Sequence, residues 1–498
     1  MYNFVMPAEE WDEMNPNKQA IRHLILKHRS GYERLNKLKR YYEGKHDILE
    51  ETNRENKLVC NHAKDISDTA SSYFIGNPVS YKSNNDITEL TDELENAGAD
   101  EVDGDNGLDL SIYGRAYEYI YTKKDETSLV VKNLPPENTF MVIDNTIEEN
   151  ELFAVYYYEQ KDDTDREVTK YIATILTQNY KYVLNIINND DPQNLYETPE
   201  PHNKGEVPVI EYLNNKLAIG DFELQIPLID AYNVLMSDRV TDKEQFIDAI
   251  LAIYGAMLAD DDDGTDEESE GNGRKAMKRL AKDKYVELPK DAKAEYLVRT
   301  YDENGVEILK KAIEQDIHKF SHIPCMSDES FGGNVSGVAM EFKLLGMENI
   351  TKIKTRYYKK GLRKRMRIFA SYMFTRSTIQ IDPRGITPVF TRSMPKNLLE
   401  ISQYVANLWG KVSKKTLLAQ IPFVDDVDEE LKAVEKETAE NIKQQQQLFG
   451  NHPNDPPEDS PDEPEDPDQK KDKTKDKSDE VLMDVYRILG KTAGTECL

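Results

Sequence analysis

The stretch SDESFGGNVSGVAMEFK (residues 327–343) carries most information about the fold, because it joins an acidic, glycine-rich loop to a long helical pattern. Gly332, Gly333 and Gly337 lie close together in this loop, and glycine adopts backbone conformations that other residues resist. The helical pattern continues over residues 338–375 with few breaks. Such a helix would span roughly 55 Å at about 1.5 Å per residue. That length is unusual in a compact domain and ordinary in a component of an assembly.

Further helices are predicted on both sides of this stretch. Apolar residues recur at every third or fourth position in several segments, which is the pattern of a helix with one buried face. The segment at residues 17–42 begins after Asn15 and Pro16, a combination typical of helix starts. The other expected helices cover residues 63–74, 108–117, 222–258, 305–320, 398–409, 415–420 and 427–449.

Residues 118–212 show a different pattern, in which short runs rich in Tyr, Val and Ile are separated by polar turns. Such runs are typical of antiparallel strands connected as hairpins. A further short hairpin is predicted at residues 284–300. The fold class is therefore α+β. The clearest expected strands are YEYIYT (117–122), SLVVKN (128–133), TFMVID (139–144), LFAVYYYEQ (152–160), KYIATILT (170–177) and YKYVLNII (180–187).

Composition restricts the possible functions. The 498 residues carry 64 basic and 93 acidic side chains, a net charge of −29, which disfavours free-standing adhesion to DNA phosphates. Passage of DNA along an acidic wall, or binding to basic partners, stays compatible with this charge. The three cysteines are scattered, so we expect a reducing cytoplasm. We find no signal-peptide pattern, and the apolar run at residues 246–258 is shorter than the ~20 residues of a membrane span.

Motifs that could carry chemistry are incomplete in this sequence. ILGKT (488–492) ends like a phosphate-binding loop, but Val485 occupies the position of the required glycine. His318, His322 and Cys325 could bind zinc, although no fourth ligand lies nearby in the sequence. An acidic loop at 259–270 matches most of the spacing of an EF-hand calcium loop, but alanine stands at the first position, where a carboxylate ligand is needed. We therefore predict no catalytic centre, no cofactor and no metal. A metal-dependent nuclease assembled from scattered acids is the alternative.

The long helical segment is unusually basic for such an acidic chain. We consider three interpretations: a solvated face, contact with nucleic acid, and pairing with acidic surfaces of neighbouring copies, which we favour. Residues 451–498 are rich in proline and charge, so we expect disorder there, with a short terminal helix at 481–490. The basic residues are Lys343, Lys352, Lys354, Arg356, Lys359, Lys360, Arg363, Lys364, Arg365 and Arg367.

Five segments in order resemble the portal proteins of tailed phages that infect Gram-positive bacteria, the SPP1-like portal family. The order and spacing fit from about residue 38 to residue 369, and the C-terminal tail is not covered. The segments are LKRYYEGKHDIL (38–49), NHAKDISDTASSYFIGNPVSY (61–81), GLDLSIYGRAYE (107–118), IHKFSHIPCMSDESFGGNVSGVAMEFKLLGMENITKIK (317–354) and KKGLRKRMRIF (359–369).

This resemblance implies a ring, usually of twelve copies, at one capsid vertex, through which double-stranded DNA is packaged and ejected. The implied partners are further copies of the chain, the terminase large subunit, a head-completion or adaptor protein, and the major capsid and scaffolding proteins. The implied location is the virion, after assembly in the host cytoplasm and without contact with a membrane. An adaptor that binds basic partners is a second alternative.

The resemblance also implies a portal fold with long stem and wing helices, an antiparallel β-rich wing, a small α/β clip and a helical crown. The implied divisions are an N-terminal segment and wing (1–221), stem helix 1 (222–258), clip (259–301), stem helix 2 (302–324), tunnel loop (325–337), long wing helix and return strand (338–396), crown (397–450) and disordered acidic tail (451–498).

The resemblance places the opening stretch in the tunnel loop, beside the DNA channel. Phe331 would pack or press at the constriction, and Asp328 and Glu329 would disfavour tight phosphate binding. An ordinary mobile connector is the alternative. The implied loop residues are Ser327, Asp328, Glu329, Ser330, Phe331, Gly332, Gly333, Asn334, Val335, Ser336 and Gly337, and the possible channel-wall residues are Lys310, Lys311, Glu314 and Lys319.

Overall fold

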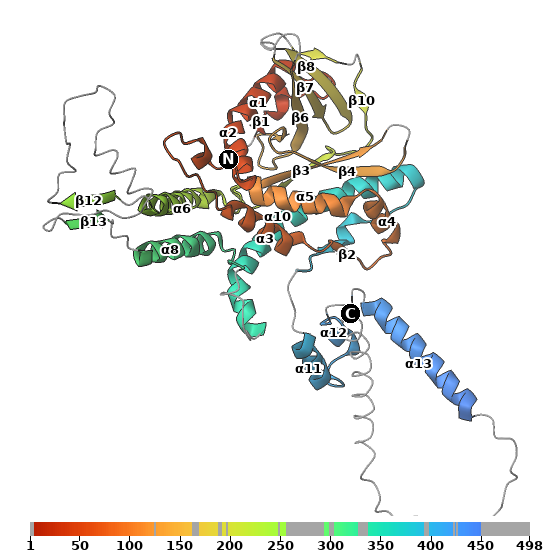
Figure 1. Ribbon diagram of the computed structural model, residues 1–498. Coiled ribbons are helices and arrows are strands. Elements are labelled where there is room, and N and C mark those ends of the chain that lie inside the picture. The colour runs from red at the N-terminus through yellow and green to blue at the C-terminus, as the bar shows by residue number, and fades with distance from the viewer. Residues whose placement is uncertain are drawn as a thin grey trace, which may run out of the picture. The chain divides into compact units, whose positions relative to one another are not determined.

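The computed structural model of the chain contains two compact units, Met1–Ser393 and Met394–Leu498 (Figure 1). It mixes helices and sheets, as the α+β prediction requires. The residues that it describes are 4–123, 126–161, 169–187, 192–195, 198–247, 250–254, 293–297, 303–326, 337–392, 398–421, 424 and 427–449.

Five helices form the N-terminal part of the first unit. The helix expected at 17–42 is interrupted at Gly31, whose N–H bonds to the carbonyl of His28. Glycine is a weak helix former, and here it separates two helices. The helix expected at 108–117 was misplaced, because Gly114 ends it with φ 76° and the chain continues as a strand. The helices are α1 (Lys18–Ser30), α2 (Tyr32–Tyr42), α3 (His62–Ile75), α4 (Thr88–Asn96) and α5 (Ala99–Tyr113).

Most strands of two sheets follow α5, and each of the six strands predicted between residues 117 and 187 pairs antiparallel with another of them. The larger sheet has the order β1-β5-β6-β7-β8-β10, with β9 beside β8, and the smaller has the order β11-β3-β4. Their strands are β1 (Phe4–Val5), β3 (Arg115–Thr122), β4 (Leu129–Leu134), β5 (Thr139–Ile143), β6 (Glu151–Lys161), β7 (Thr169–Leu176), β8 (Tyr180–Ile187), β9 (Gln193–Asn194), β10 (Glu200–Pro201) and β11 (Val209–Leu213).

Apolar contacts hold these layers together. One cluster packs α1 against the larger sheet and includes Ile21, Phe140 and Phe153. A second cluster lies between the two sheets, around Tyr117 and Val209. The third is the largest of these three and joins α3, α4, α5 and the smaller sheet to the long helix at Gly337–Ser377. The core of the first unit therefore consists of separate clusters that pack its helices and sheets against one another.

The expected helix at 222–258 is wrong in its last part. Helix α6 (Ile226–Ile247) ends earlier, and β12 (Ile250–Tyr254) pairs antiparallel with β13 (Lys293–Leu297). Periodicity alone does not distinguish a short apolar run in a helix from one in a strand. Here the backbone partner comes from a segment about forty residues away, which the local pattern does not reveal. Residues 284–290, the expected hairpin partner of the 294–300 segment, lie outside the described residues.

Two helices follow that the sequence predicted well. Helix α8 (Glu303–Ser321) matches the helix expected at 305–320. Helix α10 (Gly337–Ser377) is 41 residues long and confirms the uninterrupted helix expected at 338–375. After α10, β14 (Thr387–Val389) pairs with β2 (Ser80–Lys82).

The second unit contains three helices among its described residues. They are α11 (Leu398–Leu408), α12 (Lys414–Leu418) and α13 (Val427–Phe449), close to the expected bounds. The expected tail at 451–498 and its terminal helix lie outside the described residues.

Candidate functional site

The predicted loop lies between two elements that the structure describes. Helix α8 ends at Ser321 and α10 begins at Gly337. Gly337, which was expected in the loop, is therefore the first residue of the helix. Residues Ser327, Asp328, Glu329, Ser330, Phe331, Gly332, Gly333, Asn334, Val335 and Ser336 lie outside the described residues. The four predicted wall residues, Lys310, Lys311, Glu314 and Lys319, lie on α8.

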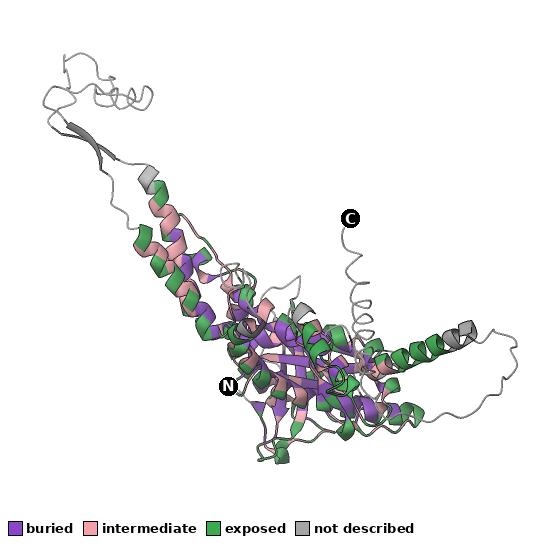
Figure 2. Ribbon diagram, turned by 90° about the horizontal axis from the view of Figure 1, so that it is seen from below, coloured by how far each residue is buried: buried purple, intermediate pink, exposed green. Residues whose placement is uncertain are grey.

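Helices α6 and α8 form an antiparallel pair that projects from the body of the first unit (Figure 2). Arg239 on α6 lies 2.8 Å from Glu307 on α8. One turn further along α6, Lys243 pairs with Glu303, one turn earlier on α8. The partners therefore follow each other in opposite directions along the two helices, as they do in an antiparallel pair. These ion pairs are partly exposed, so each contributes little, and the register also depends on packing.

The four predicted wall residues do not share one environment. Lys311 and Lys319 are exposed, together with the apolar side chains of Ile308 and Phe320. Lys310 and Glu314 lie one turn apart and are half-buried, and Lys310 lies 3.8 Å from Glu307. The structure therefore separates the four residues into two solvent-facing lysines and two side chains near the α6–α8 contact.

The base of the helix pair is built from aromatic rings. His62, at the start of α3, packs edge-on against Tyr232 of α6 and His318 of α8, with ring centroids 4.8 Å and 5.5 Å away. Burial lowers the pKa of His62, which favours its neutral form. His318 Nδ1 lies 3.0 Å from the Ile323 carbonyl oxygen and donates to it. His318 is therefore part of the joint between helices.

Within the described ranges, no group of three or more His, Cys, Asp or Glu residues is arranged to hold a metal ion. No helix in those ranges combines the length and hydropathy needed to cross a bilayer.

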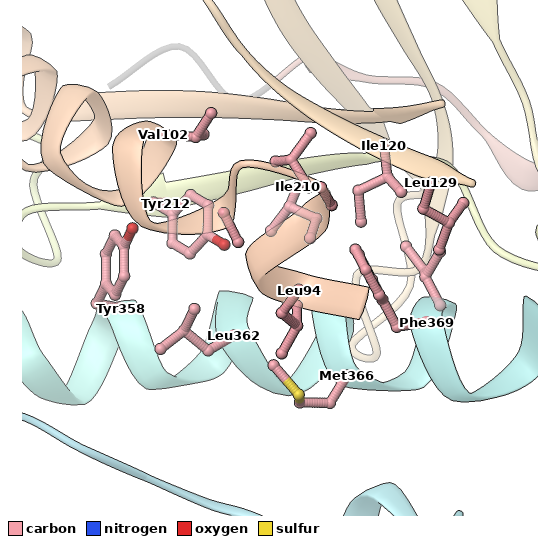
Figure 3. Packing of buried hydrophobic residues seen from close by; sticks show 14 of the residues in the cluster. Leu94, Val102, Ile120, Leu129, Ile210, Tyr212, Tyr358, Leu362, Met366 and Phe369 are labelled. Atoms are coloured by element: carbon pink, nitrogen blue, oxygen red, sulfur yellow. The ribbon is translucent and has the colours of Figure 1, made fainter. Parts of the chain in front are cut away.

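The second half of α10 lies against the smaller sheet and α4 (Figure 3). Tyr358, Leu362, Met366 and Phe369 recur at helical spacing and are buried. At Gly361 the helix approaches Tyr212 so closely that an added Cβ atom would lie 2.3 Å from its ring. A glycine is therefore required at this crossing for steric reasons.

Arg365 is fully buried at the centre of this contact, between two carboxylates. Its guanidinium donates to both oxygens of Asp103 on α5, at 2.5 and 3.0 Å, and to both oxygens of Glu118 on β3. The Tyr358 hydroxyl donates to Asp103 at 2.6 Å, and the Tyr212 hydroxyl donates to Glu118 at 2.7 Å. Burial alone would lower the pKa of Arg365, but the two carboxylates raise it well above its usual value.

Other basic side chains of α10 are also neutralised within the chain. Lys354 lies 2.7 Å from Asp221, and both side chains are buried. Lys364 pairs with Glu151 and donates to the Val209 carbonyl at 2.6 Å. These contacts correct the expectation that the basic helix as a whole serves neighbouring copies or nucleic acid. The acidic partners could not be identified from the sequence, because they lie on elements far away in the chain.

A basic stripe is nevertheless left on the outer face of α10. Lys352, Arg356, Lys360, Arg363 and Arg367 are exposed and recur at intervals of three or four residues, which places them on one face. Arg367 pairs with Glu206 at 2.7 Å, and Lys352 lies 3.6 Å from Glu348. In the part of the chain that the structure describes, Arg356, Lys360 and Arg363 have no carboxylate partner.

Exposed apolar side chains lie close to the predicted loop in sequence. Phe342 and Leu345, near the start of α10, are 72% and 49% exposed, and Ile308 on α8 is 70% exposed. On the same first half of α10, Leu344 and Met347 are buried, so this part of the helix has one buried and one exposed apolar face.

Known protein sequences match most of this chain. The sequence model of a family described as phage portal protein, SPP1 Gp6-like, matches residues 21–444. The portal protein of Bacillus phage SPP1 is 26% identical over 442 residues, which cover 84% of each chain. A portal protein of Clostridium phage phiCD119 is 24% identical over 453 residues, which cover 82% of this chain and 94% of the relative.

Proposed function

Because this chain belongs to the phage portal protein family, SPP1 Gp6-like, we propose that its copies close into a ring that conducts double-stranded DNA into and out of a capsid. Portal proteins of phages are components of the virion, and the family is a structural one and not a family of enzymes. The dodecameric ring, the capsid vertex and the packaging and ejection of the genome are the finer parts of the proposal.

The exposed apolar side chains around the helix pair carry this proposal. Ile308, Leu309 and Phe320 of α8 are between 50% and 70% exposed, and Phe342 of α10 is 72% exposed. Burying such side chains against a neighbouring copy is favourable at about 25 cal/mol per Å² of apolar surface. A closed ring would give every copy the same two neighbours, so each exposed surface would find a partner.

The elements then take the roles expected for a portal subunit. We assign α6 and α8 to the stem, the segment between β12 and β13 to the clip, α10 to the wing and the helices of the second unit to the crown. Stem helix 1 covers Ile226–Ile247 in this assignment, and not 222–258. The clip would meet the terminase large subunit and later a head-completion or adaptor protein. Capsid and scaffolding proteins would surround the wing.

We place the channel next to the α8–α10 connection. The loop at 327–337 would line the constriction, and its acids would limit binding to phosphates. Lys311 and Lys319 are the exposed wall candidates, whereas Lys310 and Glu314 lie nearer the α6–α8 contact. Acidic loop residues and basic wall residues together would let a duplex slide, because the channel would have no continuous basic surface to bind its phosphates tightly.

Negative-stain electron microscopy of the purified protein tests the proposal. Rings with a central hole are expected, and monomers at high protein concentration would contradict it. A parallel assay for magnesium-dependent cleavage of plasmid DNA addresses the nuclease alternative, which would be revived by cleavage that an acid-to-alanine change abolishes.

A further inference from the structure

A cavity of about 630 Å³ opens between the two sheets of the first unit. Residues of β3 and β4 line one side, and residues of β6, β7, β8 and β10 line the other. Figure 1 shows the smaller sheet lying beneath the larger one in this region. The volume is in the range typical of sites for small molecules, about 300–1,000 Å³. The cavity lies apart from α6 and α8, so it is not explained by the proposed channel.

The side chain of Lys204 is an unusual feature of this cavity. Lys204 is 1% exposed, and within the described chain its Nζ atom has no hydrogen-bond partner. Its closest favourable contact is with the ring of Tyr372 on α10, whose centroid lies 3.7 Å away. A buried ammonium group normally has a carboxylate partner, because burying an unpaired charge is costly. Lys354 and Lys364 follow that rule, and Lys204 does not.

The backbone around Lys204 is built to hold it in place. Asn203 and Gly205 both have left-handed conformations, with φ of 56° and 74°. His202 Nε2 donates to the Thr177 carbonyl at 3.0 Å, while its Nδ1 accepts the Lys204 N–H at 3.3 Å. Burial lowers the pKa of His202, which favours the neutral ring that both bonds need. Asparagine and glycine both tolerate this conformation, so the turn is compatible with its sequence.

The remaining lining suggests what kind of molecule would fit. Lys132 and Lys181 add positive charge, and Glu200 is the single acidic side chain among the lining residues, where it pairs with Lys181 at 3.1 Å. Tyr119 and Tyr121 stack with an interplanar angle of 14° and centroids 5.1 Å apart. The cavity therefore combines excess positive charge with flat aromatic surface, in a protein whose net charge is −29.

We propose that this cavity binds a small organic anion, a phosphate or carboxylate group carried on a flat ring, with Lys204 as the counter-charge. The anion would supply the partner that Lys204 lacks, and the ring would lie against the tyrosines. Burial lowers the pKa of Lys204 to about 8 in the unliganded protein. An anion beside the amine would raise that pKa, so binding near pH 8 would take up protons.

Isothermal titration calorimetry of the full-length protein at pH 8 tests the proposal with three probes. Deoxyadenosine monophosphate has both the anion and the flat ring, inorganic phosphate has the anion alone, and deoxyadenosine has the ring alone. We expect the nucleotide to bind at least about tenfold more tightly than either part, since a charged hydrogen bond is lost without the phosphate. Repeating the titration in two buffers of different ionisation enthalpy should reveal proton uptake.

Two variants separate this role from a structural one. Lys204→Met removes the charge while keeping most of the side-chain volume, so it should abolish nucleotide binding without lowering the thermal midpoint of unfolding. Lys216→Met changes an exposed lysine and should leave binding unchanged. The proposal is overturned if neither the nucleotide nor phosphate binds, or if Lys204→Met binds as well as the wild type. Equal affinity for phosphate and nucleotide would overturn the role of the ring.

Discussion

Arg365 and Glu118 are 247 positions apart in the sequence and form a fully buried ion pair, with Arg365 Nε 2.8 Å from Glu118 Oε1. The pair fixes the middle of α10 against β3, and Asp103 completes it from α5. Three elements from different parts of the chain therefore meet at one guanidinium group. This contact orients the long helix that carries the exposed Phe342 and Leu345 near its start.

Replacing Arg365 by Met should destabilise the fold by about 3–5 kcal/mol, because Asp103 and Glu118 would be left as uncompensated buried charges. Unfolding in urea, followed by circular dichroism, measures the loss. Arg363→Met, on the exposed face of the same helix, should change the free energy of unfolding by no more than about 0.5 kcal/mol. The combined variant Arg365→Met with Asp103→Asn and Glu118→Gln should recover part of the stability. An Arg365→Met protein as stable as the wild type would contradict the role of this cluster.

Gly361→Ala should lower the free energy of unfolding by about 1–3 kcal/mol, the usual range for an overpacked core. The added methyl group would lie 2.3 Å from the Tyr212 ring, so the helix or the ring must move. Gly346→Ala is the matched control in the same helix, because its nearest neighbour would lie 3.7 Å away. Alanine favours helix by about 1 kcal/mol over glycine, so the control should gain stability. Equal effects of both changes would show that the crossing tolerates a side chain.

His28 should make stability depend on pH between about 7 and 4. Burial lowers the pKa of His28 to about 4, while an unfolded histidine titrates near 6.5. Between these values the unfolded chain binds the extra proton, so the free energy of unfolding falls as the pH falls. A difference of about 2.5 units corresponds to about 3 kcal/mol at pH 4. His28→Gln should lose this pH-dependent contribution. The difference in the free energy of unfolding between the wild type and the variant should therefore vary with pH. A difference that does not vary with pH would rule out a buried neutral His28.

Reversing the charge of the outer stripe with Arg356→Glu, Lys360→Glu and Arg363→Glu should reduce ring assembly while leaving the fold intact. These side chains are exposed and have no carboxylate partner within the described chain, so the fold does not depend on them. Like charges would then repel where the stripe is expected to meet acidic surfaces of neighbouring copies. Size-exclusion chromatography with light scattering measures the assembly. The control, Lys123→Glu with Lys216→Glu, should still form rings, and unaffected rings in the triple variant would exclude the stripe from the contact.

Deleting residues 331–334 should leave ring assembly intact and impair DNA packaging. The motivation is the glycine-rich sequence between α8 and α10, which we place at the constriction. Particle assembly with the deleted protein, followed by measurement of packaged DNA, tests the idea. If rings with the deletion packaged DNA normally, the proposed role of the loop in packaging would be wrong.

The identity of most elements followed from the sequence. The helix at 427–449 and the six strands between 117 and 187 were predicted close to their bounds, and the order of five segments indicated the family. Local periodicity suffices in these places, because each element buries one face and the pattern records which residues lie on it.

Contacts between distant segments were decided by the tertiary structure alone. The strand at 250–254 was expected to be helical, since its partner at 293–297 is absent from the local pattern. The sequence next to Arg365 does not reveal that Asp103 and Glu118 are its partners. The sequence next to Lys204 does not reveal that its charge is unpaired or that it lies over the ring of Tyr372. The sequence by itself determined most of the elements and the family, and the tertiary structure decided which charges are buried, paired or left without a partner. The physical reason is that burial and pairing depend on residues brought together by folding, whose separation along the chain carries no periodic signal.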